Sequence, residues 1–361
     1  MSIYFFEYSY EPLYRQIKRD IEEQILNGTI IIGDKLMSET EMLKYYSCGR
    51  TTIRNALSEL VLSGCLKKEQ GFGTFCVAMP KRDVPENIDV FLNTADTYFI
   101  PYFLSGISRV LNERNCNLIL HDTLDSMEII AQTLAQVVER GTDGVIIQPY
   151  TGPEEISESC RAAIGQCAEM GIPLITIDGK FKGMNTACIM NNDNRGGLMA
   201  TEHLIQMGHR NILGIFRNRY KDSFFRAAGY QEAIAQVGFD PHMLDADATT
   251  PDDWIQYIKK ERITAIVCYN DHLAVECYHA LNSAGLRIYD DISVVGYDNT
   301  ELSSTSLPKI TSVTHPKDIM GEQAASFLLD WLEGRVAPPH HFLFQPELIK
   351  RDSVRDIRKP E

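Results

Sequence analysis

The sequence predicts an α/β protein in two parts: a small N-terminal unit of helices and a hairpin, and a larger unit of two lobes built on parallel sheets. Two observations predict it. Before residue 80, apolar residues recur at the helical period and are followed by two short strand-like runs around a glycine-rich turn. After residue 87, short apolar runs alternate with amphipathic helices, which is typical of a parallel sheet. At 361 residues, the chain is also too long for one typical core.

The first two helices have local start and stop signals. The first helix follows Pro12 and ends at Asn27-Gly28, and its apolar face is made by Leu13, Ile17, Ile21, Ile25 and Leu26. A short extended piece over residues 30–36 leads to Ser38. Ser38 and Glu41 have the spacing of a capping box, which predicts a second helix over residues 39–46.

The third helix begins after the turn Ser47-Cys48-Gly49, and its apolar face is made by Ile53, Leu57, Leu60 and Val61. Two short strands are expected over residues 65–69 and 74–77, on either side of Gln70-Gly71-Phe72-Gly73. Three helices followed by a hairpin is the order of a winged helix-turn-helix, so the sequence predicts that fold for residues 1–79.

The polar start of the third helix carries DNA-binding chemistry. Arg50, Thr51, Thr52 and Arg54 lie at its N-terminal end, where backbone N–H groups attract phosphate and arginine can reach a guanine edge. An ordinary solvated surface helix remains the alternative for this stretch alone. The chain has a net charge of −14, yet residues 44–82 have a local balance of +5. This clustering of positive charge confines the attraction for phosphate to one surface, as a DNA-binding protein requires.

Five separated motifs in residues 10–77 resemble the DNA-binding domain of the GntR family: Pro12-Leu13-Tyr14-Arg15-Gln16-Ile17, Gly33-Asp34-Lys35-Leu36, Ser38-Glu39, Arg50-Thr51-Thr52-Ile53-Arg54 and Gly71-Phe72-Gly73-Thr74-Phe75. The resemblance implies that the third helix reads the major groove through Arg50, Thr51, Thr52 and Arg54. It implies further DNA contacts from Ser38 and Glu39, with Gln70 and Gly71 at the wing tip near the minor groove or the backbone. Gly49 departs from the family, which usually has Ser or Thr there.

Residues 80–87 are polar, contain Pro80 and Pro85, and are typical of a linker. The unit over residues 88–361 then contains strand-like runs at 88–93, 118–121, 144–148, 172–177, 212–216, 265–268 and 292–296. Helices are expected between them, for example near residues 101–115 and 126–139. This length exceeds what one small doubly wound sheet needs, so we expect two lobes that share a cleft.

Ligands of parallel sheets bind at the C-terminal ends of strands. The polar residues at those positions are Asp96, Tyr98, Gln148, Asp178, Lys180, Asp193, Arg217, Arg226, Asn270 and Asp298. Carboxylates, amides and guanidinium groups in this mixture suit a ligand with many hydroxyls. For each residue a loop contact or a helix cap is the alternative, and Asp193 and Asn270 in particular have the positions of N-caps.

Residues 88–350 resemble the effector domain of the LacI family, a type I periplasmic-binding-protein-like fold. The motifs include Asn192-Asp193-Asn194-Arg195-Gly196-Gly197, Arg226-Ala227-Ala228-Gly229-Tyr230, Tyr269-Asn270-Asp271 and Val295-Gly296-Tyr297-Asp298. The resemblance implies effector contacts from Arg226, Asn270 and Asp298, and dimerisation through this domain. It implies an effector that is a sugar: arabinose or a related pentose, a hexose or a sugar acid.

These features together predict a homodimeric repressor whose affinity for double-stranded operator DNA is set by a bound sugar. The alternative is a sugar-binding α/β enzyme, but the sequence lacks the common nucleotide-binding, hydrolase and zinc-protease motifs. A secreted solute-binding protein would need a signal peptide, and the N-terminus does not resemble one. Nine scattered cysteines and no long apolar run favour a reduced, cytoplasmic location without a membrane span. No cofactor or metal is expected.

Overall fold

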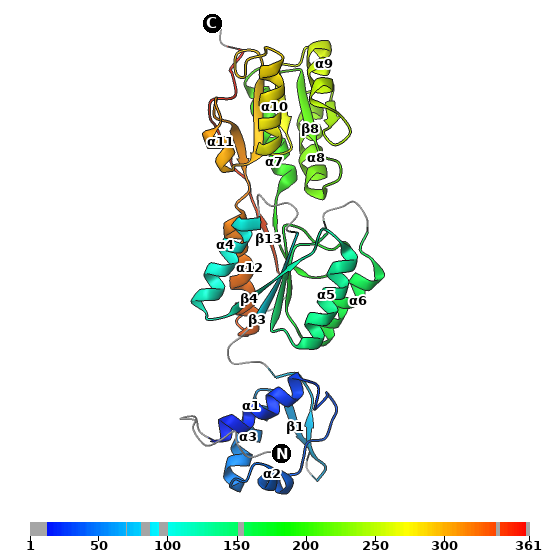
Figure 1. Ribbon diagram of the computed structural model, residues 1–361, viewed down its shortest axis with the longest axis vertical. Coiled ribbons are helices and arrows are strands. Elements are labelled where there is room, and N and C mark those ends of the chain that lie inside the picture. Colours follow the sequence, from blue (N-terminus) through cyan, green and yellow to red (C-terminus); the bar gives the residue numbers. More distant parts are fainter. Residues whose placement is uncertain are drawn as a thin grey trace.

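The computed structural model describes residues 13–69, 71–80, 87–93, 100–150, 155–336 and 340–358. A small N-terminal unit, a first lobe and a second lobe follow one another along the long axis of the molecule (Figure 1). Within the described ranges, no helix is both long enough and apolar enough to cross a bilayer.

The N-terminal unit is the predicted winged helix-turn-helix. Its elements are α1 (Leu13–Leu26), α2 (Glu39–Tyr45), α3 (Arg50–Leu62), β1 (Leu66–Glu69) and β2 (Gly73–Cys76). Residues of the three helices and the hairpin share one apolar core, which includes Ile21, Met42, Ile53 and Leu66. The segment over residues 30–36 joins the hairpin, because Gly33 and Leu36 donate backbone hydrogen bonds to Cys76 and Thr74 of β2. The predicted capping box of Ser38 and Glu41 is present at the start of α2.

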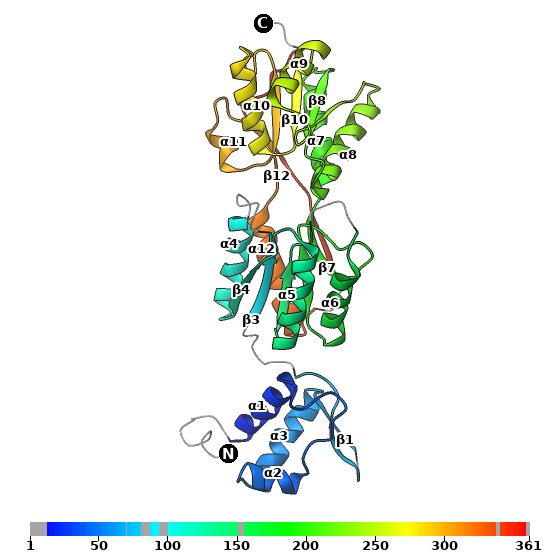
Figure 2. The same ribbon diagram turned by 45° about the vertical axis from the view of Figure 1, so that its right-hand side comes forward.

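The first lobe is a six-stranded sheet in the order β13-β7-β6-β5-β3-β4, with all neighbouring pairs parallel. Its elements are β3 (Asn87–Leu92), α4 (Ile100–Glu113), β4 (Asn117–Asp122), α5 (Met127–Arg140), β5 (Gly144–Ile147), α6 (Glu158–Glu169), β6 (Leu174–Ile177), β7 (Ala187–Asn191), α12 (Lys317–Leu332) and β13 (His341–Phe344). Helices α4 and α12 cover one face of the sheet, and α5 and α6 cover the other (Figure 2).

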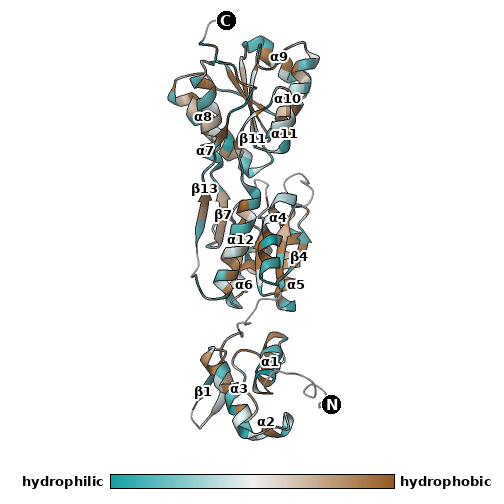
Figure 3. Ribbon diagram, turned by 90° about the vertical axis from the view of Figure 1, so that its left-hand side faces the viewer, coloured by the Kyte–Doolittle hydropathy of each residue, from teal (hydrophilic) through white to brown (hydrophobic). Residues whose placement is uncertain are grey.

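The second lobe is a six-stranded sheet in the order β14-β12-β11-β10-β8-β9, parallel except for the edge strand β14. Its elements are α7 (Asp193–Gln206), β8 (Ile212–Phe216), α8 (Lys221–Gln236), β9 (His242–Asp245), α9 (Pro251–Glu261), β10 (Ala265–Cys268), α10 (Asp271–Ser283), β11 (Ser293–Asp298), α11 (Glu301–Thr305), β12 (Thr311–Thr314) and β14 (Leu348–Ile349). Colouring by hydropathy shows apolar residues along the strands of the sheets, whereas the helices carry both apolar and polar residues (Figure 3).

The chain passes between the lobes at three places: from β7 to α7, from β12 to α12, and from β13 to β14. Sequence reasoning identified most of the central strands but not β7, β9, β12, β13 and β14. Three of these, β9, β13 and β14, are edge strands with half-buried or exposed residues, which lack the continuous apolar run of a central strand. The crossings make the lobes one continuous unit and place residues from distant segments side by side between them.

Candidate functional site

The start of α3 is an exposed polar surface. Arg50, Thr51 and Arg54 are exposed and Thr52 is half-buried, whereas Ile53, Ala56, Leu57 and Leu60 are buried in the core. The apolar face therefore fixes the rotation of the helix so that its N-terminal polar residues face solvent. Gly49 precedes the helix and has no side chain with which to cap it. The predicted DNA-contacting residues of α3 thus lie together on one accessible end of the helix.

Glu39 of α2 connects this surface to the wing. Its carboxylate lies 3.1 Å from Nε of Arg54 and 2.9 Å from Nζ of Lys68 on β1. The hydrogen bonds from Lys68 and then from Arg54 lower the pKa of Glu39. Glu39 was predicted to contact DNA, but here it holds two cations in place. Its position therefore favours an indirect role, in which it orients Arg54 and Lys68 toward DNA.

Ser38 and the wing tip complete the predicted DNA-binding set. The Ser38 hydroxyl accepts from the Glu41 N–H at 3.3 Å and donates to the Glu41 carboxylate at 2.7 Å, so it caps α2. Gly71 has a φ of +84°, a conformation that favours glycine, at the turn of the hairpin. Gln70 lies outside the described residues.

Replacing Glu39 by alanine is expected to raise affinity for random DNA and to lower the ratio of operator to random affinity. The surface becomes more positive, which strengthens attraction to any DNA. Arg54 and Lys68 also lose the carboxylate that holds their side chains in place. Protein stability should change by less than about 1 kcal/mol, because the ion pairs are solvent-exposed. Fluorescence anisotropy with both DNA types measures the ratio. Glu59→Ala, which removes the same charge near the other end of α3, is the matched control. Equal effects of the two variants would argue against positioning by Glu39.

A cavity of about 840 Å³ lies between the two lobes. Six of the predicted effector residues line it: Gln148, Asp178, Lys180, Asp193, Arg226 and Asp298. They come from the segments directly after β5 and β6, the start of α7, α8 and the end of β11, so both lobes contribute. The rest of the lining is mixed: aromatic and apolar side chains form one part of it, and charged or amide side chains such as Glu155, Lys182 and Lys221 form another. The aromatic and apolar part includes Tyr150, Tyr220, Phe224, Phe225 and Leu343. A polar floor beside an aromatic wall suits a ligand with hydroxyls on its edge and C–H groups on its face.

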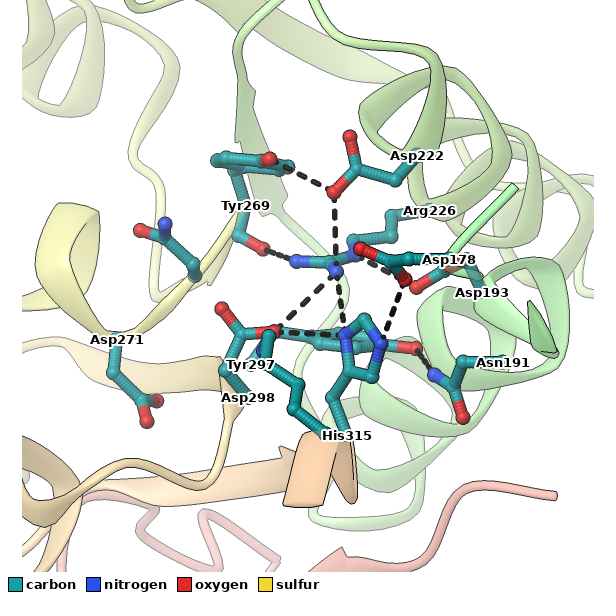
Figure 4. A network of polar contacts seen from close by, with 12 residues as sticks. Asp178, Asn191, Asp193, Asp222, Arg226, Tyr269, Asp271, Tyr297, Asp298 and His315 are labelled. Carbon is teal, nitrogen blue, oxygen red and sulfur yellow. Dashed lines mark hydrogen bonds and ion pairs between the residues drawn. The ribbon is translucent and has the colours of Figure 1, made fainter. Parts of the chain in front are cut away.

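Arg226 is the centre of the polar floor (Figure 4). Its Nε donates to Asp193 at 2.9 Å, and its Nη1 donates to the Tyr269 carbonyl at 2.8 Å. Its Nη2 lies 3.2 Å from Asp222 and 3.3 Å from Asp298. The guanidinium carbon also lies 3.8 Å from the ring centroid of Tyr297. The side chain is almost fully buried, so these groups hold the guanidinium in one orientation.

His315 and Lys317 lie on the crossing from β12 to α12 and reach the same place. His315 lies 2.9 Å from Asp178 of the first lobe through Nε2 and 3.3 Å from Asp298 of the second lobe through Nδ1. Lys317, the first residue of α12, lies 2.9 Å from Asp298. Asp178 and Asp298 both have positive φ, at +60° and +89°, although neither is glycine. Such backbone conformations cost free energy and are concentrated at functional sites.

The charges of this network are arranged so that Asp298 stays ionised. Burial alone would raise the pKa of Asp298, but Lys317 and Arg226 beside it hold that pKa well below its usual value. Burial and Lys317 would lower the pKa of His315, yet Asp178 and Asp298 raise it overall. Burial raises the pKa of Asp222 to about 6. The site therefore contains one carboxylate fixed as an anion and another that titrates near neutral pH.

Glycines allow α7 and α8 to approach closely enough to form the site. A Cβ added to Gly197 of α7 would collide with the carbonyl of Arg226, and one added to Gly229 of α8 would collide with the carbonyl of Asn194. Close backbone contact at these two positions places Arg226 of α8 against Asp193 at the start of α7. The motifs around these glycines thus encode the distance between the two helices.

Two predicted effector residues lie away from this cavity. The Asn270 side chain accepts from the Leu273 N–H at 2.9 Å and caps α10, which was its alternative role. Arg217 pairs with Asp247 at 2.6 Å and with Glu276 at 3.2 Å, and it is not among the cavity-lining residues. Asp193 does not cap α7, because Asn192 does so and leaves Asp193 to bind Arg226. Asp96 and Tyr98 lie outside the described residues.

Sequence reasoning missed Asp222, Tyr269, Tyr297, His315 and Lys317. Asp222 could have been found, because it precedes Arg226 by one helical turn in a predicted helix. His315 and Lys317 follow β12, a strand that was not predicted, so no strand end pointed to them. Tyr297 was part of a motif that resembles the LacI family but was not assigned a role, although its hydroxyl accepts from Asn191 at 3.1 Å.

Comparisons with known proteins match both units. Residues 13–76 match the family described as bacterial regulatory proteins of the gntR family, and residues 201–354 match the periplasmic binding protein-like domain. The chain is 31% identical over 360 residues to the arabinose metabolism transcriptional repressor of Geobacillus stearothermophilus, covering 96% of this chain and 98% of that relative. It is 28% identical over 369 residues to the repressor of the same name from Halalkalibacterium halodurans, with the same coverages.

Among solved structures, a LacI family transcriptional regulator from Enterococcus faecium with bound ribose has a TM-score of 0.63 and 24% identity. The match covers 75% of this chain and all of that chain. At this identity the likeness concerns the fold of the two lobes.

Proposed function

The chain belongs to the family of the arabinose metabolism transcriptional repressors, and from that premise we propose that it represses sugar-utilisation genes in the cytoplasm and senses an uncharged sugar between its lobes. The relatives matched over nearly their full length are named as transcriptional repressors, which favours a regulator over an enzyme. The observation that carries the proposal is the buried Arg226 network between the lobes, on the same chain as an exposed DNA-binding helix.

The network favours a neutral ligand over a sugar acid. The nitrogens of the Arg226 guanidinium are directed at Asp193, Asp222, Asp298 and the Tyr269 carbonyl, so a ligand carboxylate would have to displace one of them. Arg217, the other arginine among the predicted effector residues, is paired outside the cavity. Sugar hydroxyls can instead donate to these carboxylates without displacing a partner of Arg226.

The aromatic wall supplies the second half of the recognition. Phe224 and Phe225 are 47% and 58% exposed and both line the cavity. Tyr220 stacks on Tyr269 with ring centroids 5.9 Å apart and so extends this wall toward the polar floor. Exposed aromatic side chains in a cavity favour a ligand with an apolar face, and the C–H face of a sugar ring is one.

Binding can regulate DNA affinity because the ligand would touch both lobes and the crossings. A ligand alters an equilibrium only through its different affinities for the two states, here two relative orientations of the lobes. A coupling free energy of about 1–3 kcal/mol would change operator affinity about 5- to 150-fold. We propose that two chains pair through the lobes and that their two helix-turn-helix units read the half-sites of a palindromic operator.

The test is a thermal-shift screen of the full chain against pentoses, hexoses, disaccharides, sugar acids and sugar phosphates. A specific ligand at a hundredfold excess over its dissociation constant stabilises the protein by about 2.7 kcal/mol. We expect a neutral sugar to raise the Tm and to change binding of an operator selected from genomic fragments. A response to sugar acids or phosphates alone would contradict the neutral-sugar proposal. No response to any sugar, together with no operator selected, would contradict the function itself.

Sugar affinity is expected to fall as the pH is lowered from 7.5 to 5. Asp222 has a pKa of about 6 because burial raises it, so its carboxylate is ionised above that pH and protonated below it. The protonated carboxyl group accepts fewer hydrogen bonds from sugar hydroxyls. It also no longer neutralises the positive charge of Arg226. Isothermal titration at a series of pH values measures the effect. Asp222→Asn should flatten the profile, whereas Asp247→Asn, outside the cavity, should not.

A further inference from the structure

The wing ends in an exposed aromatic side chain. Phe72 is 71% exposed, although large apolar residues are usually covered. Its backbone N–H donates to the Glu69 carbonyl at 3.1 Å and closes the turn between β1 and β2. The glycines on either side have φ of +84° at Gly71 and +129° at Gly73. The hairpin therefore presents Phe72 at its tip.

Cationic side chains lie along the strand that leads to this turn. Lys67 and Lys68 are exposed on β1, where Lys67 pairs with Glu69 at 3.1 Å and Lys68 pairs with Glu39 at 2.9 Å. The aliphatic part of Lys35 packs beneath the turn, where a Cβ added to Gly73 would lie 2.7 Å from Lys35 Cε. An apolar tip among lysines differs from a surface built only to hold phosphates, because the lysines can pair with the backbone while the ring is left for the bases.

We infer that Phe72 is a wedge that enters the minor groove beside each half-site and partly unstacks one base step. The inference rests on the proposed function, since it takes the partner to be operator DNA. Apolar side chains such as phenylalanine are used in this way by minor-groove proteins, and the kinks they produce are about 20–90°. Pyrimidine–purine steps unstack most easily, so the wing selects a TA or CA step at the flank of the operator without reading base edges.

The inference is tested with the full chain and its selected operator, carrying 2-aminopurine at successive flanking positions. Binding of the unsubstituted protein raises the fluorescence at one flanking step, and end-to-end energy transfer reports a bend. Phe72→Ala abolishes both signals and weakens operator binding about 10- to 100-fold, the range for loss of a specific contact. The dependence of affinity on salt stays the same, because no phosphate contact is lost. Phe72→Leu retains part of each signal.

Leu62→Ala is the matched control, since Leu62 is 90% exposed at the other end of α3 from the DNA-contacting residues. It leaves all three measurements unchanged. The Phe72→Lys variant distinguishes two roles for this position, insertion between bases and contact with a phosphate. If the lysine variant binds more tightly and keeps the bend and the fluorescence change, the wedge is overturned. The wedge is also overturned if Phe72→Ala behaves like the unsubstituted protein. Both results leave the proposed repressor function intact, which fails only if the unsubstituted protein selects no operator.

Discussion

Replacing Arg226 by alanine is expected to abolish the response to sugar and to lower the free energy of unfolding by about 3–5 kcal/mol, the cost of removing one partner from a buried ion pair. The side chain is 2% exposed and its guanidinium lies within 3.3 Å of three carboxylates, those of Asp193, Asp222 and Asp298. Without it these carboxylates repel one another in a buried site. Lys317 and His315 remain beside Asp298 but do not replace the contacts to Asp193 and Asp222.

The stability change is measured by urea unfolding of the full chain. The protein has two tryptophans, Trp254 in the second lobe and Trp331 in the first, so a Trp331→Phe background reports the second lobe. Arg217→Ala is the matched control, because it removes an arginine of the same lobe whose ion pairs are partly exposed and lie outside the cavity. It should cost less than about 1 kcal/mol and leave the sugar response intact. An Arg226→Ala protein with unchanged stability and sugar affinity would contradict the assignment of this centre.

Replacing Arg50 by alanine is expected to weaken operator binding about 10- to 100-fold while sugar binding stays unchanged. Arg50 is the first residue of α3 and is exposed there, and a bidentate contact from arginine to guanine contributes about 1–3 kcal/mol of discrimination. The change lies in a unit with its own apolar core, so the cavity between the lobes should be unaffected.

Anisotropy titrations with operator and random DNA, at two salt concentrations, separate the possible roles of Arg50. Loss on the operator alone identifies a base contact, whereas equal loss on both, with a smaller salt slope, identifies a phosphate contact. Arg19→Ala, which removes an exposed arginine of α1, is the control for the change in net charge. A variant that binds the operator as tightly as the unsubstituted protein would remove Arg50 from the DNA-binding surface.

Local signals in the sequence were sufficient for the N-terminal unit. The capping box of Ser38 and Glu41, the apolar face of α3 and the glycines of the hairpin each depend on residues a few positions apart. In the lobes, the same reasoning found most of the buried central strands, whose residues are apolar on both faces, but not β7 and β12. It missed edge strands such as β9 and β13, because their residues are only partly buried and follow no strong pattern.

Only some of the predicted effector residues line the cavity between the lobes. Strand-end positions led to Asp178, Asp193 and Asp298, which the structure brings together with Arg226. Arg226 was also assigned to a strand end, but it lies within α8, ten residues after β8 ends. The same rule also selected Asn270 and Arg217, whose side chains turn to nearer partners, a backbone N–H of α10 and two acidic residues. A sequence position specifies where a strand ends but does not specify which partner its side chain finds there.

The sequence by itself determined the order of the units, their fold classes, the exposed polar end of α3 and the choice of Arg226 as a candidate, because each depends on local periodicity or on a contiguous motif. Only the tertiary structure decided which groups surround that arginine. The packing of the two lobes, with the crossings from β7 to α7 and from β12 to α12, brings residues 178, 193, 226, 298 and 315 within hydrogen-bonding distance of one another or of a shared partner. Contacts between residues so far apart in the chain depend on how two sheets and three connecting segments pack, which no local pattern encodes.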